Sequence, residues 1–134
     1  MMSLFSIFNV SSSAMAAQSL RLNATASNMA NADAVATKPE DAYKAREPVF
    51  QQVMEQNGGV GVRVSGITQS TAPNPALYEP GNPLANKDGY VFSSNVNPVE
   101  EMVNMLSASR SYQTNVQMMD TAKNLALRTL QLGQ

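Results

Sequence analysis

The chain of 134 residues contains no cysteine, histidine or tryptophan, and only 14% of its residues are charged. Without cysteine and histidine it has no thiolate nucleophile, no imidazole base and no ligands for a zinc finger or a histidine-bound haem. Any metal site would have to use oxygen ligands alone. The absence of cysteine also excludes disulfide bonds, and it fits any cellular compartment.

Charge of either sign is scarce. Nine Lys and Arg residues face ten Asp and Glu residues, giving a formal net charge of −1. Because no basic stripe is present, the sequence predicts binding to neither nucleic acid nor anionic lipid. The polar character comes from Ser, Thr, Asn and Gln instead of the roughly 25% charged residues of an ordinary soluble protein. Such a surface favours burial against copies or partners, and this length favours one domain.

The N-terminus contains a short apolar run, from Leu4 to Val10, followed by small residues. This resembles a secretory signal peptide, but no Lys or Arg precedes Arg21 and polar residues such as Asn9 interrupt the run. We therefore expect no cleaved signal peptide. No stretch approaches the roughly 20 apolar residues of a membrane span, so we expect no direct membrane insertion.

Helix-breaking residues are concentrated in the middle of the chain. All seven prolines and six of the seven glycines lie between Pro39 and Pro98, which leaves both ends free to form long helices. We expect one helix from Ser3 to about Asp33 and a second from Asn97 to Leu132. Asn97 suits the N-cap, and Pro98 suits the first helical position.

This distribution predicts an α+β fold, mainly α, in which two long terminal helices pair as a coiled-coil-like layer around a small β-rich insert. The segments are an N-terminal helix in 1–38, a turn-containing β insert in 39–96 and a C-terminal helix in 97–134. The two helices are expected to form one structural unit. In the insert, alternation over 60–64 predicts one half-buried strand, 43–54 is a weaker strand candidate, and Asn57 is expected in an exposed loop.

Both predicted helices carry residues at alternating spacings of three and four, the period of a coiled coil. In the first helix, large and small residues alternate along this seam. The predicted seams are Phe8, Ser12, Met15, Ser19, Leu22, Ala26 and Met29, and Met102, Met105, Ser109, Tyr112, Val116, Met119, Lys123, Ala126 and Leu130. Packing of the two helices on each other explains any single seam residue, but the first helix has almost no charged face for water. It is therefore expected to pack on more than one side.

Candidate catalytic and metal-binding groups are few. The neighbouring carboxylates of Glu100 and Glu101 are explained by the start of the second helix, where negative charge is favourable. Glu79, Asn82 and Asp88 could offer oxygen ligands to Ca²⁺, but they lack the spacing of an EF-hand, and turn formation is favoured. The sequence predicts no enzyme, no cofactor and no metal site.

Three motifs resemble those of the bacterial flagellar rod and hook proteins, the axial protein family. Ser27-Asn28-Met29-Ala30-Asn31 resembles the Ser-Asn-x-Ala-Asn signature near their N-terminus. The segments 78–85 and 89–91 are similar to the central signature of the proximal rod branch. So are 101–104, 107–113 and the closing 132–134. The resemblance spans nearly the whole chain.

The resemblance implies a structural subunit of the proximal rod of the flagellar basal body. Such a subunit is exported through the flagellar type III apparatus without signal cleavage. It would assemble with other rod proteins and with copies of itself into a helical tube crossing the periplasm. This tube would begin at the export gate and MS ring and would transmit torque. The expected interface residues are Met15, Leu22, Asn28, Met29, Asn31, Met102, Met105, Arg110, Tyr112, Gln113, Val116, Met119 and Leu130.

A second class of protein shares the long helices and the lack of catalytic residues. This alternative is a small soluble helical adaptor or type III secretion chaperone that acts as a dimer. Such proteins usually carry strongly charged surfaces, which this chain lacks.

Overall fold

The structure is a computed structural model, and it describes residues 3–56 and 58–133. Asn57, expected in an exposed loop, and Gln134, the last residue of the C-terminal motif, lie outside the described residues. The elements in chain order are α1 (Leu4–Ala30), β1 (Val35–Ala36), a 3₁₀ turn (Pro39–Asp41), β2 (Arg46–Met54), β3 (Val60–Gln69), β4 (Ala76–Tyr78), β5 (Tyr90–Ser93) and α2 (Pro98–Leu132).

The helix starts are set by side-chain caps. The Ser3 hydroxyl accepts the backbone N–H of Ser6, and the Asn97 side chain accepts the N–H groups of Val99 and Glu100. The predicted Asn97 cap is thereby confirmed. At its other end α1 stops at Ala30, three residues before the predicted end, because the chain turns there to enter β1.

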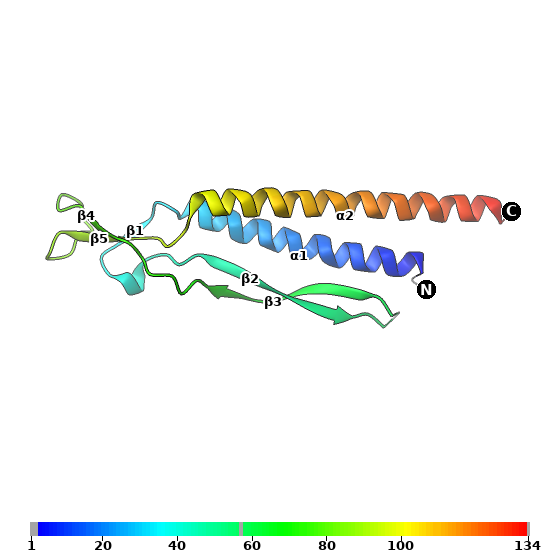
Figure 1. Cartoon of the computed structure of the whole chain (residues 1–134), viewed down its shortest axis with the longest axis horizontal. Helices are drawn as coiled ribbons and strands as arrows, with labels where there is room; N and C mark the ends of the chain where they lie inside the picture. The colour runs from blue at the N-terminus through cyan, green and yellow to red at the C-terminus, as the bar shows by residue number, and fades with distance from the viewer. Residues whose placement is uncertain (1–2, 57, 134) are drawn as a thin grey trace.

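The two helices and the two-stranded ribbon β2–β3 form three layers (Figure 1). α1 and α2 run antiparallel, and the two-stranded ribbon β2–β3 lies along the opposite side of α1, so that α1 is the middle layer. At 1.5 Å per residue the 35 residues of α2 span about 52 Å, whereas the 27 residues of α1 span about 40 Å. The C-terminal end of α2 therefore projects beyond the start of α1 (Figure 1).

The ribbon and the small sheet occupy different parts of the molecule. In the ribbon, β2 pairs antiparallel with β3 from Arg46 opposite Gln69 to Met54 opposite Val60, with an irregularity between Val49 and Phe50. The three-stranded sheet has the order β1-β5-β4 and lies at the end of the molecule away from both chain termini (Figure 1). The predicted strand over 60–64 is part of β3, and the weaker candidate over 43–54 contains β2.

The interior is built from small side chains. The buried apolar residues are Ala17, Ala24, Ala42, Ala45, Val91, Ala108 and Ala122. Apart from Val91 they are all alanines, whereas many Leu, Met, Val and Phe side chains are exposed. Because hydrophobic stabilisation scales with the apolar area removed from water, the single chain leaves much of its apolar surface unused.

The fold class predicted from the sequence is confirmed: two long terminal helices pack together, and small β elements lie between them in the chain. Within the described residues, neither helix is long and apolar enough to cross a membrane.

Candidate assembly surfaces

The seam between the helices differs in half of its positions from the predicted one. In α2, Met105, Tyr112, Met119 and Ala126 are shielded as predicted, but the alternate positions belong to Glu101, Ala108, Asn115 and Ala122. The predicted alternate positions, Met102, Ser109, Val116 and Lys123, each lie one residue further along. Of these, Met102, Val116 and Lys123 are exposed. Two of the alternate positions in the observed seam carry alanine, Ala108 and Ala122, and their small side chains let the helix backbones approach closely.

The same shift occurs in α1. Met15, Leu22 and Met29 are half-buried as the predicted seam requires, whereas Ser12, Ser19 and Ala26 are exposed. Ser11 and Thr25, one residue earlier, are buried in their place. The prediction was therefore wrong for the alternate positions of both helices, because alternating spacings of three and four residues fit the neighbouring positions equally well.

One hydrogen bond and one shared apolar notch mark the antiparallel alignment of the helices. The Arg21 guanidinium donates to the Asn104 side-chain oxygen at 3.3 Å. At the opposite end, Phe8 and Leu130 line one apolar notch. α1 thus faces α2 over its whole length.

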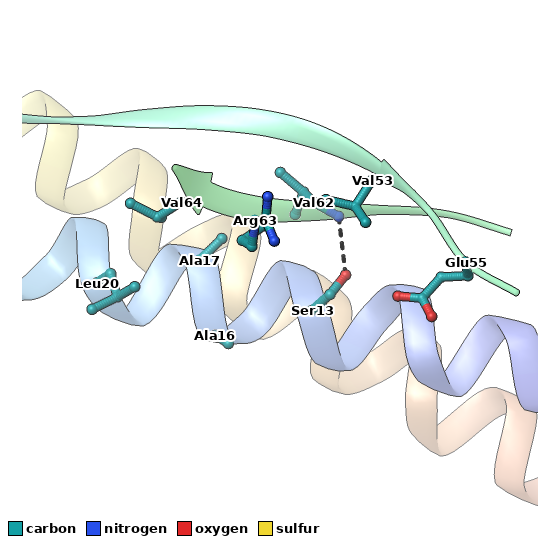
Figure 2. A pocket seen from close by; sticks show the side chains of 9 residues that line it. All are labelled: Ser13, Ala16, Ala17, Leu20, Val53, Glu55, Val62, Arg63 and Val64. Atoms are coloured by element: carbon teal, nitrogen blue, oxygen red, sulfur yellow. Dashed lines mark hydrogen bonds between the residues drawn. The ribbon is translucent and has the colours of Figure 1, made fainter. Parts of the chain in front are cut away.

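A second face of α1 holds the ribbon. The Ser13 hydroxyl accepts the Val62 backbone N–H at 3.1 Å, and a Cβ on Gly61 would lie 3.1 Å from that hydroxyl oxygen. Further along α1, Ala17 and Leu20 line an open groove of about 320 Å³ beneath the ribbon (Figure 2). As predicted, α1 therefore packs on more than one side, in this case within its own chain.

Asn28 locks the start of the ribbon to α1. Its side-chain nitrogen donates to the Arg46 carbonyl at 3.0 Å, and its side-chain oxygen accepts the Arg46 N–H at 2.8 Å. The Tyr43 hydroxyl donates to the same oxygen at 2.8 Å. Asn28 is 2% exposed, so these contacts within the chain occupy the residue that was expected to contact a neighbouring subunit.

Two further asparagines complete this junction. Asn95 accepts the Ala45 N–H at 2.6 Å and donates to the Ala72 carbonyl at 2.9 Å. Asn74 donates to the carbonyls of Tyr43 and Ser93 at 3.0 and 2.9 Å. We call these three residues, Asn28, Asn74 and Asn95, the asparagine clamp. The clamp holds residues 43–46 between the helices, the ribbon and the small sheet.

Two further motif residues, Asn31 and Asn82, make local hydrogen bonds. Asn31 donates to the Ser27 carbonyl at the end of α1. Asn82 accepts the Leu84 N–H and donates to the Glu79 carboxylate, so its side chain is used in the turn. Within the described residues, no group of three or more acidic side chains is arranged to hold a metal ion.

The outer face of α2 carries an apolar stripe that the sequence analysis missed. Val99, Met102, Val103 and Leu106 are 69%, 52%, 59% and 72% exposed. Val103 and Leu106 border a shallow groove with Ser107, Arg110 and Ser111. We call Val99, Met102, Val103 and Leu106 the outer stripe. The spacing of Val99, Val103, Leu106, Arg110 and Gln113 by four and three residues could have revealed it as a second seam.

A second apolar surface lies at the end of the helix pair. Leu4, Phe5 and Phe8 of α1 and Ala126 and Leu130 of α2 form an apolar notch of about 240 Å³, together with Thr129. Phe5 is 76% exposed and Leu130 is 67% exposed. Of the residues predicted for the interface, Met102, Arg110, Gln113, Val116 and Leu130 are exposed.

Comparisons with known proteins match this chain at both ends and over its full length. Residues 8–36 match the family described as flagella basal body rod protein. Residues 87–132 match the family described as flagellar basal body rod FlgEFG protein C-terminal. The two matched regions contain most of α1 and all of α2.

Full-length relatives give the same assignment. The chain is 49% identical to the flagellar basal-body rod protein FlgC of Salmonella typhimurium over 99% of this chain and 100% of the relative. It is 51% identical to FlgC of Yersinia enterocolitica and 43% identical to FlgC of Buchnera aphidicola from Acyrthosiphon pisum, with the same coverage. Because these relatives are 43–51% identical and are covered over their whole length, the chain belongs to the FlgC family of flagellar basal-body rod proteins.

Proposed function

We propose that the helix pairs (α1 and α2) of neighbouring subunits lie side by side in the rod and cover one another's outer stripes. The chain is a structural, non-enzymatic subunit of the flagellar basal-body rod, and its family assembles with other rod proteins. In this arrangement the helix pair forms the inner tubular layer, and the ribbon and the small sheet lie further out. The family assignment replaces the dimeric adaptor as an explanation for the long helices.

The observation that carries the proposal is the outer stripe. Four large apolar side chains in less than three turns of one helix are more than 50% exposed, and apolar clusters of this kind mark interaction sites. The interior of the chain is mostly alanine, so the large side chains remain available for contacts between subunits. Each contact is small, but a repeated contact between different surfaces builds an open helical assembly in which many copies add up.

The predicted interface residues divide into two groups under this proposal. The exposed group, Met102, Arg110, Gln113, Val116 and Leu130, contacts neighbouring subunits directly. The half-buried group, Met15, Leu22, Met29, Met105, Tyr112 and Met119, shapes the helix pair that presents those contacts. Asn28 and Asn31 act within the chain by fixing the ribbon and the end of α1.

The finer assignment is a subunit of the proximal rod, close to the export gate and MS ring. The subunit would travel unfolded through the flagellar type III apparatus and then polymerise with other rod proteins in the periplasm. The charge-poor N-terminal helix and the absence of a predicted cleaved signal peptide support this route. Shear between the helix pairs would then carry torque to the distal rod.

Deletion of the gene and complementation test the proposal. Cells with the deletion should lose motility, and the full chain without tags at its termini should restore it. Quantitative mass spectrometry should then find the chain in detergent-extracted basal bodies at its full-length mass. Motile deletion cells, or a chain found only in the soluble fraction, would contradict the proposal.

A further inference from the structure

The ribbon β2–β3 leaves part of one strand edge unpaired. In an antiparallel pair, the backbone N–H and C=O groups of successive residues point alternately toward the partner strand and away from it. The Val62 N–H donates to Ser13 of α1, away from β2, and Val62 lies opposite Gln52. Both backbone groups of Arg46 bind Asn28, away from β3. The outward backbone groups of β2 therefore belong to its even-numbered residues, from 46 to 54.

The two halves of this edge differ. In the first half, α1 binds the edge at Arg46, and Pro48 has no N–H group. In the second half, β3 lies between α1 and β2 (Figure 1 and Figure 2), so the edge around Gln52 points away from α1. Within the described residues, no hydrogen bond reaches the outward backbone groups of Phe50, Gln52 and Met54. Each of these three residues therefore offers a free donor and a free acceptor.

The free part of the edge lacks the usual protection against strand pairing. Edge strands are normally protected by charged residues, by proline or by a covering element. Residues 49–54 contain no charge and no proline, and Met54 is 81% exposed. Val64 lies opposite Phe50 and Val60 lies opposite Met54, so these four side chains share one face of the ribbon. An added strand would gain both a backbone ladder and apolar neighbours.

This edge is complementary to itself. When a second copy runs antiparallel with its Gln52 opposite Gln52 of the first, Phe50 of each copy lies opposite Met54 of the other. Every opposed pair then joins residues with outward groups, so each pair can exchange two hydrogen bonds. No like charges meet, and each phenyl ring lies beside a thioether. Because α1 lies on the far side of β3 here, the helices of the two copies stay apart.

We propose that two copies of the free subunit pair through their β2 edges around Gln52 and form a continuous four-stranded sheet. Such a two-fold contact closes on itself, whereas the proposed helical assembly repeats a contact between different surfaces. The pair therefore describes subunits outside the rod, and it is independent of the proposed cover of the outer stripe. Because the interface consists of a few strand residues, the pair is expected to be weak and to form at high concentration.

Single cysteines at two neighbouring positions test the register, because the natural chain contains no cysteine. Gln52→Cys places two thiols opposite each other, where Cα atoms about 5.5 Å apart permit a disulfide. Gln51→Cys is the matched control: Gln51 is also exposed, but its side chain lies on the other face and away from the two-fold axis. Under mild oxidation, the purified full-length Gln52→Cys chain should form disulfide-linked dimers at least tenfold faster. Equal rates would overturn the inference.

Analytical ultracentrifugation of the chain without cysteine is the second measurement. Over a dilution series, the wild-type chain should pass from dimer to monomer. Gln52→Lys places like charges opposite each other, so it should stay monomeric with unchanged helix content by circular dichroism. Thr68→Lys, at an exposed position of β3 opposite Glu47, should dimerise like the wild type.

Two outcomes of the ultracentrifugation would overturn the inference. One is a dimer that Gln52→Lys leaves intact. The other is a wild-type chain that is monomeric at every concentration; if Gln52→Lys were then also lost from basal bodies, the edge would belong to a contact with another rod subunit. The rod assignment itself fails only if the wild-type chain is absent from basal bodies.

Discussion

The junction and the helix pair of this elongated molecule are completed in different ways. At the junction, the asparagine clamp joins the helices, the ribbon and the small sheet through hydrogen bonds within the chain, and Asn28 alone makes three of them. Along the helix pair, the buried residues are small and the large apolar side chains of the outer stripe are exposed. The junction therefore satisfies its polar groups internally, whereas the helix pair leaves apolar surface exposed, which the proposed assembly would cover.

Under the proposed function, the junction serves folding and the outer stripe serves assembly. Hydrogen bonds have strict geometry and fix the junction in one arrangement. Apolar contacts are less directional, so in the proposed assembly the helix pair would be able to pack on neighbours that differ in sequence. A rod built from several kinds of subunit requires both properties.

The largest effect is expected when the same change, Leu to Asp, is made once in the outer stripe and once in the seam between the helices. Leu106→Asp places a charge on the outer stripe, so it should reduce incorporation into basal bodies at least a hundredfold while circular dichroism shows an unchanged helix content. Leu22→Asp places the same charge at a half-buried seam position. It should destabilise the helix pair itself by on the order of 3 kcal/mol.

The control for both is Thr71→Asp, at an exposed polar position near the junction. It should leave the helix content, the unfolding temperature and the incorporation unchanged. Normal incorporation of Leu106→Asp would show that the outer stripe faces solvent in the rod.

The next effect concerns the junction. Asn28→Leu keeps the side-chain size but leaves the Arg46 backbone groups and the Tyr43 hydroxyl without their partner. The free energy of unfolding should fall by about 3 kcal/mol, since each polar group left unpaired costs about 1–3 kcal/mol. Hydrogen exchange should show faster loss of protection at the Arg46 amide. Asn31→Ala removes a single bond at the helix end and should cost less than about 1 kcal/mol; equal effects would disprove the special role of Asn28.

A smaller effect is expected in the turn between β4 and β5. Gly89 has φ +84°, and an added Cβ would lie 2.9 Å from a ring carbon of Tyr78. Gly89→Ala should therefore cost about 1–3 kcal/mol through strain and displacement of that ring. Gly66→Ala is the matched control, because a Cβ there meets nothing within 4 Å. Limited proteolysis across 78–90 should increase for Gly89→Ala alone.

The smallest effect is expected from removing a buried polar atom of α1, the side-chain oxygen of Gln18. Within the described residues, the Gln18 side-chain oxygen is the one buried side-chain atom that lacks a hydrogen-bond partner. Gln18→Met keeps the length and removes that acceptor, so the chain should gain about 1 kcal/mol in stability. Chemical denaturation would measure the gain. A loss of stability would indicate that Gln18 has a partner in solution.

The sequence predicted the long-range organisation better than the contacts. The positions of proline and glycine located both helices, and Asn97 located the start of α2 to the residue. The helix period also placed Met105, Tyr112 and Met119 in the seam. It could not choose between Ala108 and Ser109, or between Ala122 and Lys123, because alternating spacings of three and four residues fit either of two neighbouring positions.

The asparagine clamp could not be predicted for a different reason. Asn28, Asn74 and Asn95 bind backbone groups that are 18 to 50 residues away in sequence. A local pattern does not contain these partners. Asn28 in the Ser-Asn-x-Ala-Asn motif was therefore assigned to a contact between subunits, although the structure uses it inside the chain. Whether the other predicted interface residues contact neighbours stays a prediction.

Labelling of a single cysteine tests the central claim most directly, because the natural chain contains no cysteine. Val103→Cys places a thiol on the outer stripe, where the side chain is 59% exposed in the single chain. A maleimide should label it quickly in the purified subunit, at least tenfold more slowly in intact basal bodies, and quickly again after the basal bodies are dissociated. Equal labelling rates in the purified subunit and in intact basal bodies would contradict the claim that neighbouring subunits cover the outer stripe.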